Sequence, residues 1–182
     1  MTDPRLLMSA STKTHMNLVE RASVFATAAH AAVGQLRKYT GEPYIVHPAA
    51  VASIVATVPH TNAMLAAAWL HDVVEDTKIS IALLRREFGD EVANLVWWLT
   101  DQSKPEDGNR AKRKEIDRLH SAAAPAAAQT VKVADLIENT FSIEAHDSDF
   151  AVVFRKEKKL LLAVLTKADR VLLERAAQQL SS

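Results

Sequence analysis

Apolar residues recur every three or four positions along most of this chain, and this spacing constrains its fold more than any other feature. Within residues 16–33, for example, Leu18, Ala22 and Phe25 share one predicted helical face, and Glu20 lies on the opposite face. No segment alternates apolar and polar residues as convincingly as a half-buried strand would. The pattern therefore predicts an all-α fold.

Glycine and proline divide this pattern into segments. Gly34 and Gly41 belong to a predicted loop that ends at His47, and Pro48 suits the first turn of the next helix. A polar, aperiodic segment at 101–110 predicts an exposed loop. The predicted helices are 16–33, 48–58, 63–77, 81–88, 90–100, 110–124, 130–146 and 149–168, followed by an amphipathic tail at 169–180.

Composition limits the class of protein. A chain of 182 residues suits one folding unit, taken as 1–182 with its core at about 18–175. Lys plus Arg and Asp plus Glu number 22 each, which argues against a long nucleic acid as partner. The lack of cysteine excludes disulfides and Cys-rich zinc sites.

Charged residues interrupt every apolar run before the roughly 20 residues that a membrane span needs. We expect a cytoplasmic protein without a membrane partner; the sequence leaves open whether it forms a homodimer.

Four polar residues interrupt the apolar helix predicted at 63–77. His71 and Asp72 are adjacent, and Glu75 and Asp76 follow one turn later on overlapping faces. Carboxylates and an imidazole near a core are costly without partners, and a divalent cation would satisfy them. A satisfied His–Asp pair is the alternative for the first two residues, and a helix-end salt bridge or cap is the alternative for the last two.

Two further residues are candidates to meet this group. His47 ends the preceding loop, and Asp135 lies in the segment VKVADLIEN. Two histidines and two aspartates offer nitrogen and hard oxygen ligands, which suit Mn²⁺, Fe²⁺ or Zn²⁺ better than Ca²⁺. Glu75 or Asp76 would then lie close enough to accept a proton from the attacking water.

Other residues suit a small anionic partner. Arg37 and Lys38 precede His47 in the glycine-bounded loop, where a guanidinium can stack on a base and an ammonium can meet phosphate. Arg113 belongs to a basic helix face, and Asn139 and Ser142 follow Asp135 on nearby faces. Solvated surface charge and structural hydrogen bonds are the ordinary alternatives for these residues.

Four segments give the chain a family resemblance: RKYTGEPYIVHP, LHDVVEDT, FGDEVANLVWWLTD and VKVADLIENT. In this order and approximate spacing they resemble the hydrolase domain of the RelA/SpoT homologue family, and the chain is similar in size to its small alarmone hydrolases. The resemblance runs from about residue 21 to residue 169. It implies an HD-domain helical bundle and hydrolysis of the 3′-pyrophosphate of (p)ppGpp, or of its adenosine analogues (p)ppApp.

The resemblance also assigns roles by position. It implies one Mn²⁺ at the metal site and water activation by the two acidic residues after the HD pair. It implies a base pocket lined by Arg37 and Lys38, with Asn139 and Ser142 facing the nucleotide. The implied metal ligands are His47, His71, Asp72 and Asp135, and the implied catalytic residues are Glu75 and Asp76.

This chain departs from the family pattern at two places. The family more often has LADRxHN where this chain has VADLIEN, and a threonine often stands where this chain has Ser142. The first departure alters the charge beside the site. Two rival functions remain: another HD-domain enzyme, such as a nucleotidase or dNTP triphosphohydrolase, and a non-catalytic metal- or nucleotide-binding module.

Overall fold

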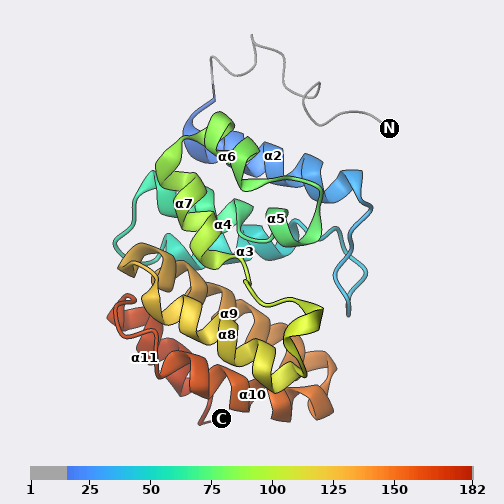
Figure 1. Ribbon diagram of the computed structural model, residues 1–182, viewed down its shortest axis with the longest axis vertical. Helices are drawn as coiled ribbons and strands as arrows, with labels where there is room; N and C mark the ends of the chain where they lie inside the picture. The colour runs from blue at the N-terminus through green and yellow to red at the C-terminus, as the bar shows by residue number, and fades with distance from the viewer. Residues whose placement is uncertain (1–15, 182) are drawn as a thin grey trace.

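A computed structural model describes residues 16–181, and helices dominate it (Figure 1). Within this range there is no strand, and the only β feature is an isolated antiparallel bridge between Leu36 and Pro43. The all-α prediction is confirmed. In chain order the helices are α2 (Leu18–Ala32), α3 (Val46–Val55), α4 (Asn62–Leu70), α5 (Val73–Asp76), α6 (Ile81–Phe88), α7 (Asp90–Leu99), the short 3₁₀ helix η2 (Pro105–Asp107), α8 (Arg110–Ala123), α9 (Ala126–His146), α10 (Ser148–Leu162) and α11 (Arg170–Gln178).

Polar side chains define where several helices begin. Asn17 accepts hydrogen bonds from the backbone of Val19 and Glu20, and the Glu20 carboxylate accepts one from the Asn17 backbone, which completes a capping box. Ser80 and Asn109 cap α6 and α8 in the same way with their side-chain oxygens. These local signals explain why the predicted starts of α6 and α8 agree with the structure.

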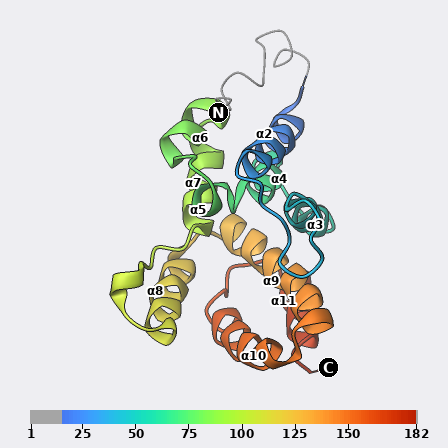
Figure 2. The same ribbon diagram turned by 90° about the vertical axis from the view of Figure 1, so that its right-hand side faces the viewer.

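The helices form two layers that meet along α9. In Figure 1, α2 to α7 lie above and α8 to α11 lie below, and Figure 2 shows α9 at the junction. Helix α4 packs against α2, α3 and α7, while α9 packs against α3, α7, α10 and α11. No described helix has both the length and the apolar character to cross a bilayer.

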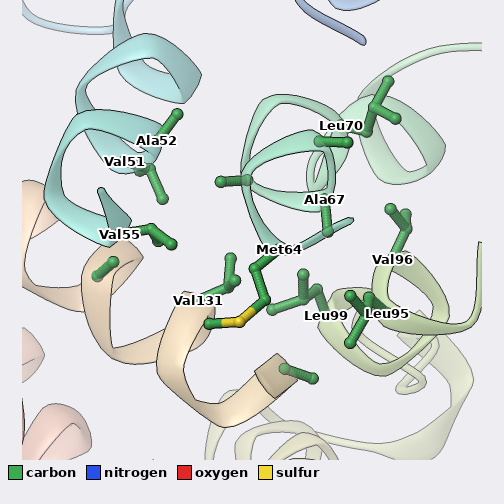
Figure 3. Close-up of a cluster of buried hydrophobic side chains, with 14 of the residues drawn as sticks. Val51, Ala52, Val55, Met64, Ala67, Leu70, Leu95, Val96, Leu99 and Val131 are labelled. Carbon is green, nitrogen blue, oxygen red and sulfur yellow. The ribbon is translucent and has the colours of Figure 1, made fainter. Parts of the chain in front are cut away.

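One continuous core joins the two layers. Figure 3 shows Met64 of α4 beside Val131 of α9 and Leu99 of α7. Ala66, Ala67 and Ala68 of α4 are fully buried, and their small side chains allow neighbouring helices to approach closely. The buried cluster extends along the chain from Ala22 to Ala176.

The structure differs from the sequence prediction at some helix ends. Helix α3 begins at Val46, so His47 lies in its first turn and not at the end of a loop. Helix α9 begins at Ala126, directly after Pro125, four residues earlier than predicted. Helix α10 ends at Leu162, well before the predicted end at residue 168.

The predicted helix at 63–77 is also divided. Helix α4 ends at Leu70, His71 and Asp72 form a turn, and α5 then runs from Val73 to Asp76. The His71 ring donates from Nδ1 to the carbonyl of Ala68 at 2.8 Å, which gives a C-terminal carbonyl of α4 a side-chain partner. The turn therefore takes His71 and Asp72 out of the regular helix and fixes the His71 ring at the same time.

Candidate metal centre and nucleotide cavity

Four predicted ligands converge where α3, the α4–α5 turn and α9 meet. His71 Nε2 lies 3.1 Å from Asp72 Oδ2, and His47 Nε2 lies 3.5 Å from the same oxygen. Asp135 Oδ1 lies 3.2 Å from His47 Nε2 and 3.7 Å from His71 Nε2. One ligand atom from each of His47, His71 and Asp72 lies within 4.8 Å of the others. Ligand atoms about 2.1 Å from one ion are themselves roughly 3–4 Å apart, so this spacing fits a single metal ion.

The hydrogen bonds of the two imidazoles indicate what belongs between them. His71 donates from Nδ1 to a carbonyl, which leaves the lone pair of Nε2 facing Asp72 and Asp135. This buried nitrogen has no hydrogen-bond partner in the described residues. His47 likewise donates from Nδ1 to Glu138 and directs Nε2 toward the two aspartates. Two lone pairs facing two carboxylates require a cation, so the donor set fits a divalent metal.

The electrostatics of the cluster lead to the same conclusion. Burial opposes protonation of His71, but the negative charges of Asp72 and Asp135 outweigh it and raise the pKa of His71 well above its ordinary value. Burial is likewise outweighed at His47, where hydrogen bonds to Asp135 and Glu138 raise the pKa of the ring. The cluster thus favours positive charge between the carboxylates, as a proton or as a metal ion.

Sequence reasoning missed Glu138, which orients His47. Its carboxylate accepts the His47 Nδ1 proton and also accepts from Arg37 Nη2 at 3.0 Å and 3.3 Å. Glu138 stands where the family pattern LADRxHN has histidine. The departure VADLIEN therefore places a second carboxylate behind a metal-ligand candidate, and Arg37 balances its charge.

Two more residues that we did not predict hold the acidic groups. The Tyr44 hydroxyl donates to Asp72 Oδ2 at 2.5 Å, and the Gln35 amide donates to Asp76 Oδ2 at 2.8 Å. Both lie in or next to RKYTGEPYIVHP. No sequence signal in a single chain pairs them with carboxylates about 30 to 40 positions away.

Glu75 lies at the edge of the centre. Its Oε1 accepts a hydrogen bond from the backbone N–H of Asp101 at 2.6 Å. The residue as a whole is exposed, but partial burial of its carboxylate and the negative charge of Asp101 raise the pKa of Glu75 to about 7. A carboxylate with such a pKa can accept or return a proton near neutral pH.

A cavity of about 330 Å³ brings together four of the five residues predicted to bind substrate. Arg37 and Lys38 line one side, and Asn139 and Ser142 of α9 line the other. Phe150 completes the wall, and Lys38 Nζ lies 5.7 Å from the centre of its ring. Its size and its mixture of aromatic, cationic and amide groups suit a nucleoside.

The fifth predicted substrate residue, Arg113, lies apart from this cavity. It belongs to α8 and is half-buried, and it lines neither this cavity nor the one between α8, α9 and α10. The predicted site therefore divides into a metal centre and an adjoining cavity, and Arg113 has no place in either. Asn139 connects the two parts, because its amide donates to Asp135 Oδ1 at 2.6 Å.

The fold and the His–Asp cluster define the class of protein. The family model described as the HD domain matches residues 22–173, and the chain belongs to this family. HD domains depend on a metal ion, and His47, His71 and Asp72 form a group that can hold one.

Individual relatives give a more specific resemblance. The chain is 37% identical over 151 residues to a probable guanosine-3′,5′-bis(diphosphate) 3′-pyrophosphohydrolase of Synechocystis, covering 81% of this chain and 20% of the relative. It is 40% identical over 128 residues to a probable GTP pyrophosphokinase of Mycobacterium leprae, covering 70% of this chain and 16% of the relative. This chain thus spans a fifth or less of the length of these two relatives.

A solved structure shares the fold along nearly its full length. It is that of a metazoan ortholog of SpoT that hydrolyzes ppGpp, and it superposes with a TM-score of 0.80 at 24% identity. The match covers 90% of this chain and 94% of that chain. The helical arrangement described above is therefore that of a solved structure.

Proposed function

We propose that this chain is a metal-dependent hydrolase that removes the 3′-pyrophosphate of (p)ppGpp or of its adenosine analogue (p)ppApp. The observation that carries this proposal is the pair of imidazole lone pairs directed at two aspartates, beside a cavity lined by Arg37 and Asn139. The names of the Synechocystis relative and of the metazoan structural neighbour support the same substrate class.

We further propose that His47, His71, Asp72 and Asp135 hold one Mn²⁺. The nitrogen and oxygen donors suit Mn²⁺, and they also accommodate Fe²⁺ or Zn²⁺. When bound, such an ion lowers the pKa of water and stabilises charge on a phosphoryl oxygen. Glu138 accepts a hydrogen bond from His47, and Tyr44 donates one to Asp72, so that both ligands are held in orientation.

Residues of the chain supply the remaining chemistry. Glu75 accepts the proton of the attacking water, and Asp76, held by Gln35, orients that water or serves the leaving oxygen. The water oxygen bonds to the phosphorus attached to the ribose 3′-oxygen, and the 3′-O–P bond breaks. Pyrophosphate leaves, and the ribose 3′-oxygen takes up a proton.

The adjoining cavity positions the nucleoside in this proposal. Arg37 keeps its guanidinium fixed through Glu138, so that the exposed part of its plane can stack on a base. Lys38 is 72% exposed, and its ammonium, which is paired with Asp147 at 3.3 Å, meets a phosphate or the base edge in this proposal. Asn139 and Ser142 offer hydrogen bonds to the ribose.

A substrate panel tests the proposal. Metal-loaded protein is incubated with ppGpp, pppGpp, ppApp and pppApp, and the products are separated by liquid chromatography. We expect pyrophosphate together with the matching 5′-di- or triphosphate nucleotide, and we expect the variant Glu75→Gln with Asp76→Asn to retain metal and lose turnover.

The same assay distinguishes the rivals. Cleavage of 5′-mononucleotides or dNTPs alone would assign the chain to another HD-domain activity. Tight binding of an alarmone without pyrophosphate release over hours would favour a non-catalytic module.

A further inference from the structure

A second cavity, of about 300 Å³, lies between α8, α9 and α10. Figure 2 shows α8 and α10 on opposite sides of the space below α9. Asp135 forms part of its wall, so the cavity adjoins the metal centre, and Asn139 lines both this cavity and the one described above. The two cavities therefore meet at one turn of α9.

Four cations line this second cavity, and two of them have carboxylate partners. Lys114 pairs with Asp101 at 3.0 Å, and Lys132 lies 3.6 Å from Asp135. Within residues 16–181, the other two, Arg118 and Lys158, form no ion pair with a carboxylate.

The remaining carboxylates around the cavity are already engaged. Glu157 lines the cavity, but it pairs at 2.7 Å with Arg110, which lies outside the lining. Asp117 accepts hydrogen bonds from two backbone N–H groups and from the Ser103 hydroxyl. Arg118 and Lys158 therefore line one cavity without a direct ion pair in the described residues, although the charge of Glu115 acts on Arg118 and that of Glu144 acts on Lys158.

Lys158 is an unusual residue to find in this position. It is only 1% exposed, and its Nζ donates to Thr140 Oγ1 at 2.7 Å and to Gln179 Oε1 at 2.6 Å. An ammonium has three donors, so one remains after these two neutral acceptors. Burial lowers the pKa of Lys158 to about 8, which still leaves the amine mostly protonated at neutral pH. The charge of Glu144 attracts this ammonium without forming an ion pair with it, so the cost of burial is only partly offset, and an anionic ligand would offset it further.

We propose that this cavity binds the distal phosphate of the 3′-diphosphate, the part of the substrate that leaves as pyrophosphate, through Arg118 and Lys158. This inference rests on the proposed function, which places the scissile phosphate at the metal centre. The distal phosphate is one P–O–P bridge away from the scissile phosphate. Asp135 belongs to the metal centre and also lines this cavity, so the two phosphates can occupy adjoining sites. In this arrangement the 5′-phosphates lie on the opposite side of the ribose from the 3′-diphosphate, and Asn139 lies between the two phosphate chains.

The first test measures binding without turnover. Inorganic pyrophosphate is titrated calorimetrically into the metal-loaded protein, and elemental analysis confirms that the metal stays bound. Arg118→Gln and Lys158→Met should each weaken pyrophosphate binding about tenfold, because each removes a charge-assisted hydrogen bond. Lys156→Gln removes an exposed charge from the same helix, away from the cavity, and should leave binding unchanged.

The second test asks which phosphate chain occupies the cavity. The KM of Arg118→Gln is compared for ppGpp and for guanosine 3′-diphosphate, which lacks 5′-phosphates. We expect a similar rise for both substrates. A rise confined to ppGpp, or unchanged pyrophosphate affinity in Arg118→Gln, would overturn the assignment.

These outcomes are separable from failure of the proposed function. If the wild-type protein hydrolyses no alarmone, the proposed function is wrong, and the calorimetric titration still decides whether the cavity takes pyrophosphate. Lys158→Met removes a buried ammonium that donates to Thr140 and Gln179 and can reduce stability, so Arg118→Gln, at a half-buried position, provides the decisive comparison.

Discussion

The Gln35 side-chain amide donates a hydrogen bond of 2.8 Å to Asp76 Oδ2, and this bond joins the loop after α2 to the end of α5. The other end of the Gln35 amide is also hydrogen-bonded, because His30 Nδ1 donates to Gln35 Oε1 at 2.6 Å. His30 is 1% exposed, and burial lowers its pKa, which favours the neutral ring. A buried neutral histidine thus fixes the amide orientation, and the amide fixes the carboxylate.

Replacing Gln35 with Leu should lower kcat about tenfold, because Asp76 loses the donor that positions it. The metal ligands keep their contacts, so metal content measured by elemental analysis should not change. Thr40→Ala is a matched control, since Thr40 lies in the same loop and its hydroxyl accepts a hydrogen bond from the nearby Glu42 backbone. An unaltered kcat in Gln35→Leu would mean that the position of Asp76 does not matter for turnover.

Glu138 gives a prediction about metal affinity. Glu138→Gln keeps the side-chain shape but removes the charge that holds His47 Nδ1 and pairs with Arg37. We expect the affinity for Mn²⁺ to fall by roughly tenfold or more, measured by competition with a chelating indicator. Glu144→Gln on the same helix breaks a distant ion pair with Arg155 and should leave the affinity as it was. Equal affinities in the two variants would show that the metal centre does not depend on Glu138.

Much of the fold could be predicted because its signals are local. Apolar spacing indicates the helices, and capping residues such as Ser80 and Asn109 mark where they start. The metal-ligand candidates could also be proposed, since a His–Asp pair and two more acidic groups on an apolar helix are costly without a partner. The turn at His71 was not predicted, because the backbone there stays close to helical and a side-chain hydrogen bond ends the helix.

The residues that support the centre could not be predicted, because their partners are distant along the chain. Glu138 and His47 are 91 positions apart, and Gln35 and Asp76 are 41 apart. A glutamate on a helix has many ordinary roles, and only the packing of α3 against α9 shows which one it has here. Arg113 illustrates a residue whose placement the sequence could not give. A basic helix face was visible in the sequence, but the rotation of α8 directs Lys114 and Arg118 to the cavity and leaves Arg113 outside it.

The raised pKa values of His47 and His71 predict how the metal stabilises the protein. Without metal, the folded state binds these protons more tightly than the unfolded state. That contribution to stability is complete below the ordinary histidine pKa and is lost as pH rises through the raised values. Metal binding requires neutral rings, so protons compete with it. The difference in Tm between metal-loaded and chelator-treated protein should therefore be larger at about pH 8 than at about pH 6.

Two variants check the source of this pH dependence. His47→Asn removes one ligand and should abolish most of the Tm difference at either pH. His60→Asn changes a histidine whose Nδ1 contacts the Val58 carbonyl away from the centre, and it should behave like the wild type. A Tm difference that stays constant with pH would contradict proton competition at the two imidazoles.

Glu75 determines the expected pH dependence of turnover. Partial burial and the charge of Asp101 raise the pKa of Glu75 to about 7, and the carboxylate accepts a proton only when it is ionised. The value of kcat/KM should therefore rise with pH through about 7 and then level off, and Glu75→Gln should lower kcat by on the order of 10²–10⁴-fold.

Asp101→Asn removes the neighbouring negative charge but keeps the backbone N–H that binds Glu75, so the midpoint of the pH profile should move to lower pH. Asp107→Asn, in the same loop, should leave the midpoint in place. If Asp101→Asn shares the wild-type midpoint, the group that titrates in turnover is not Glu75.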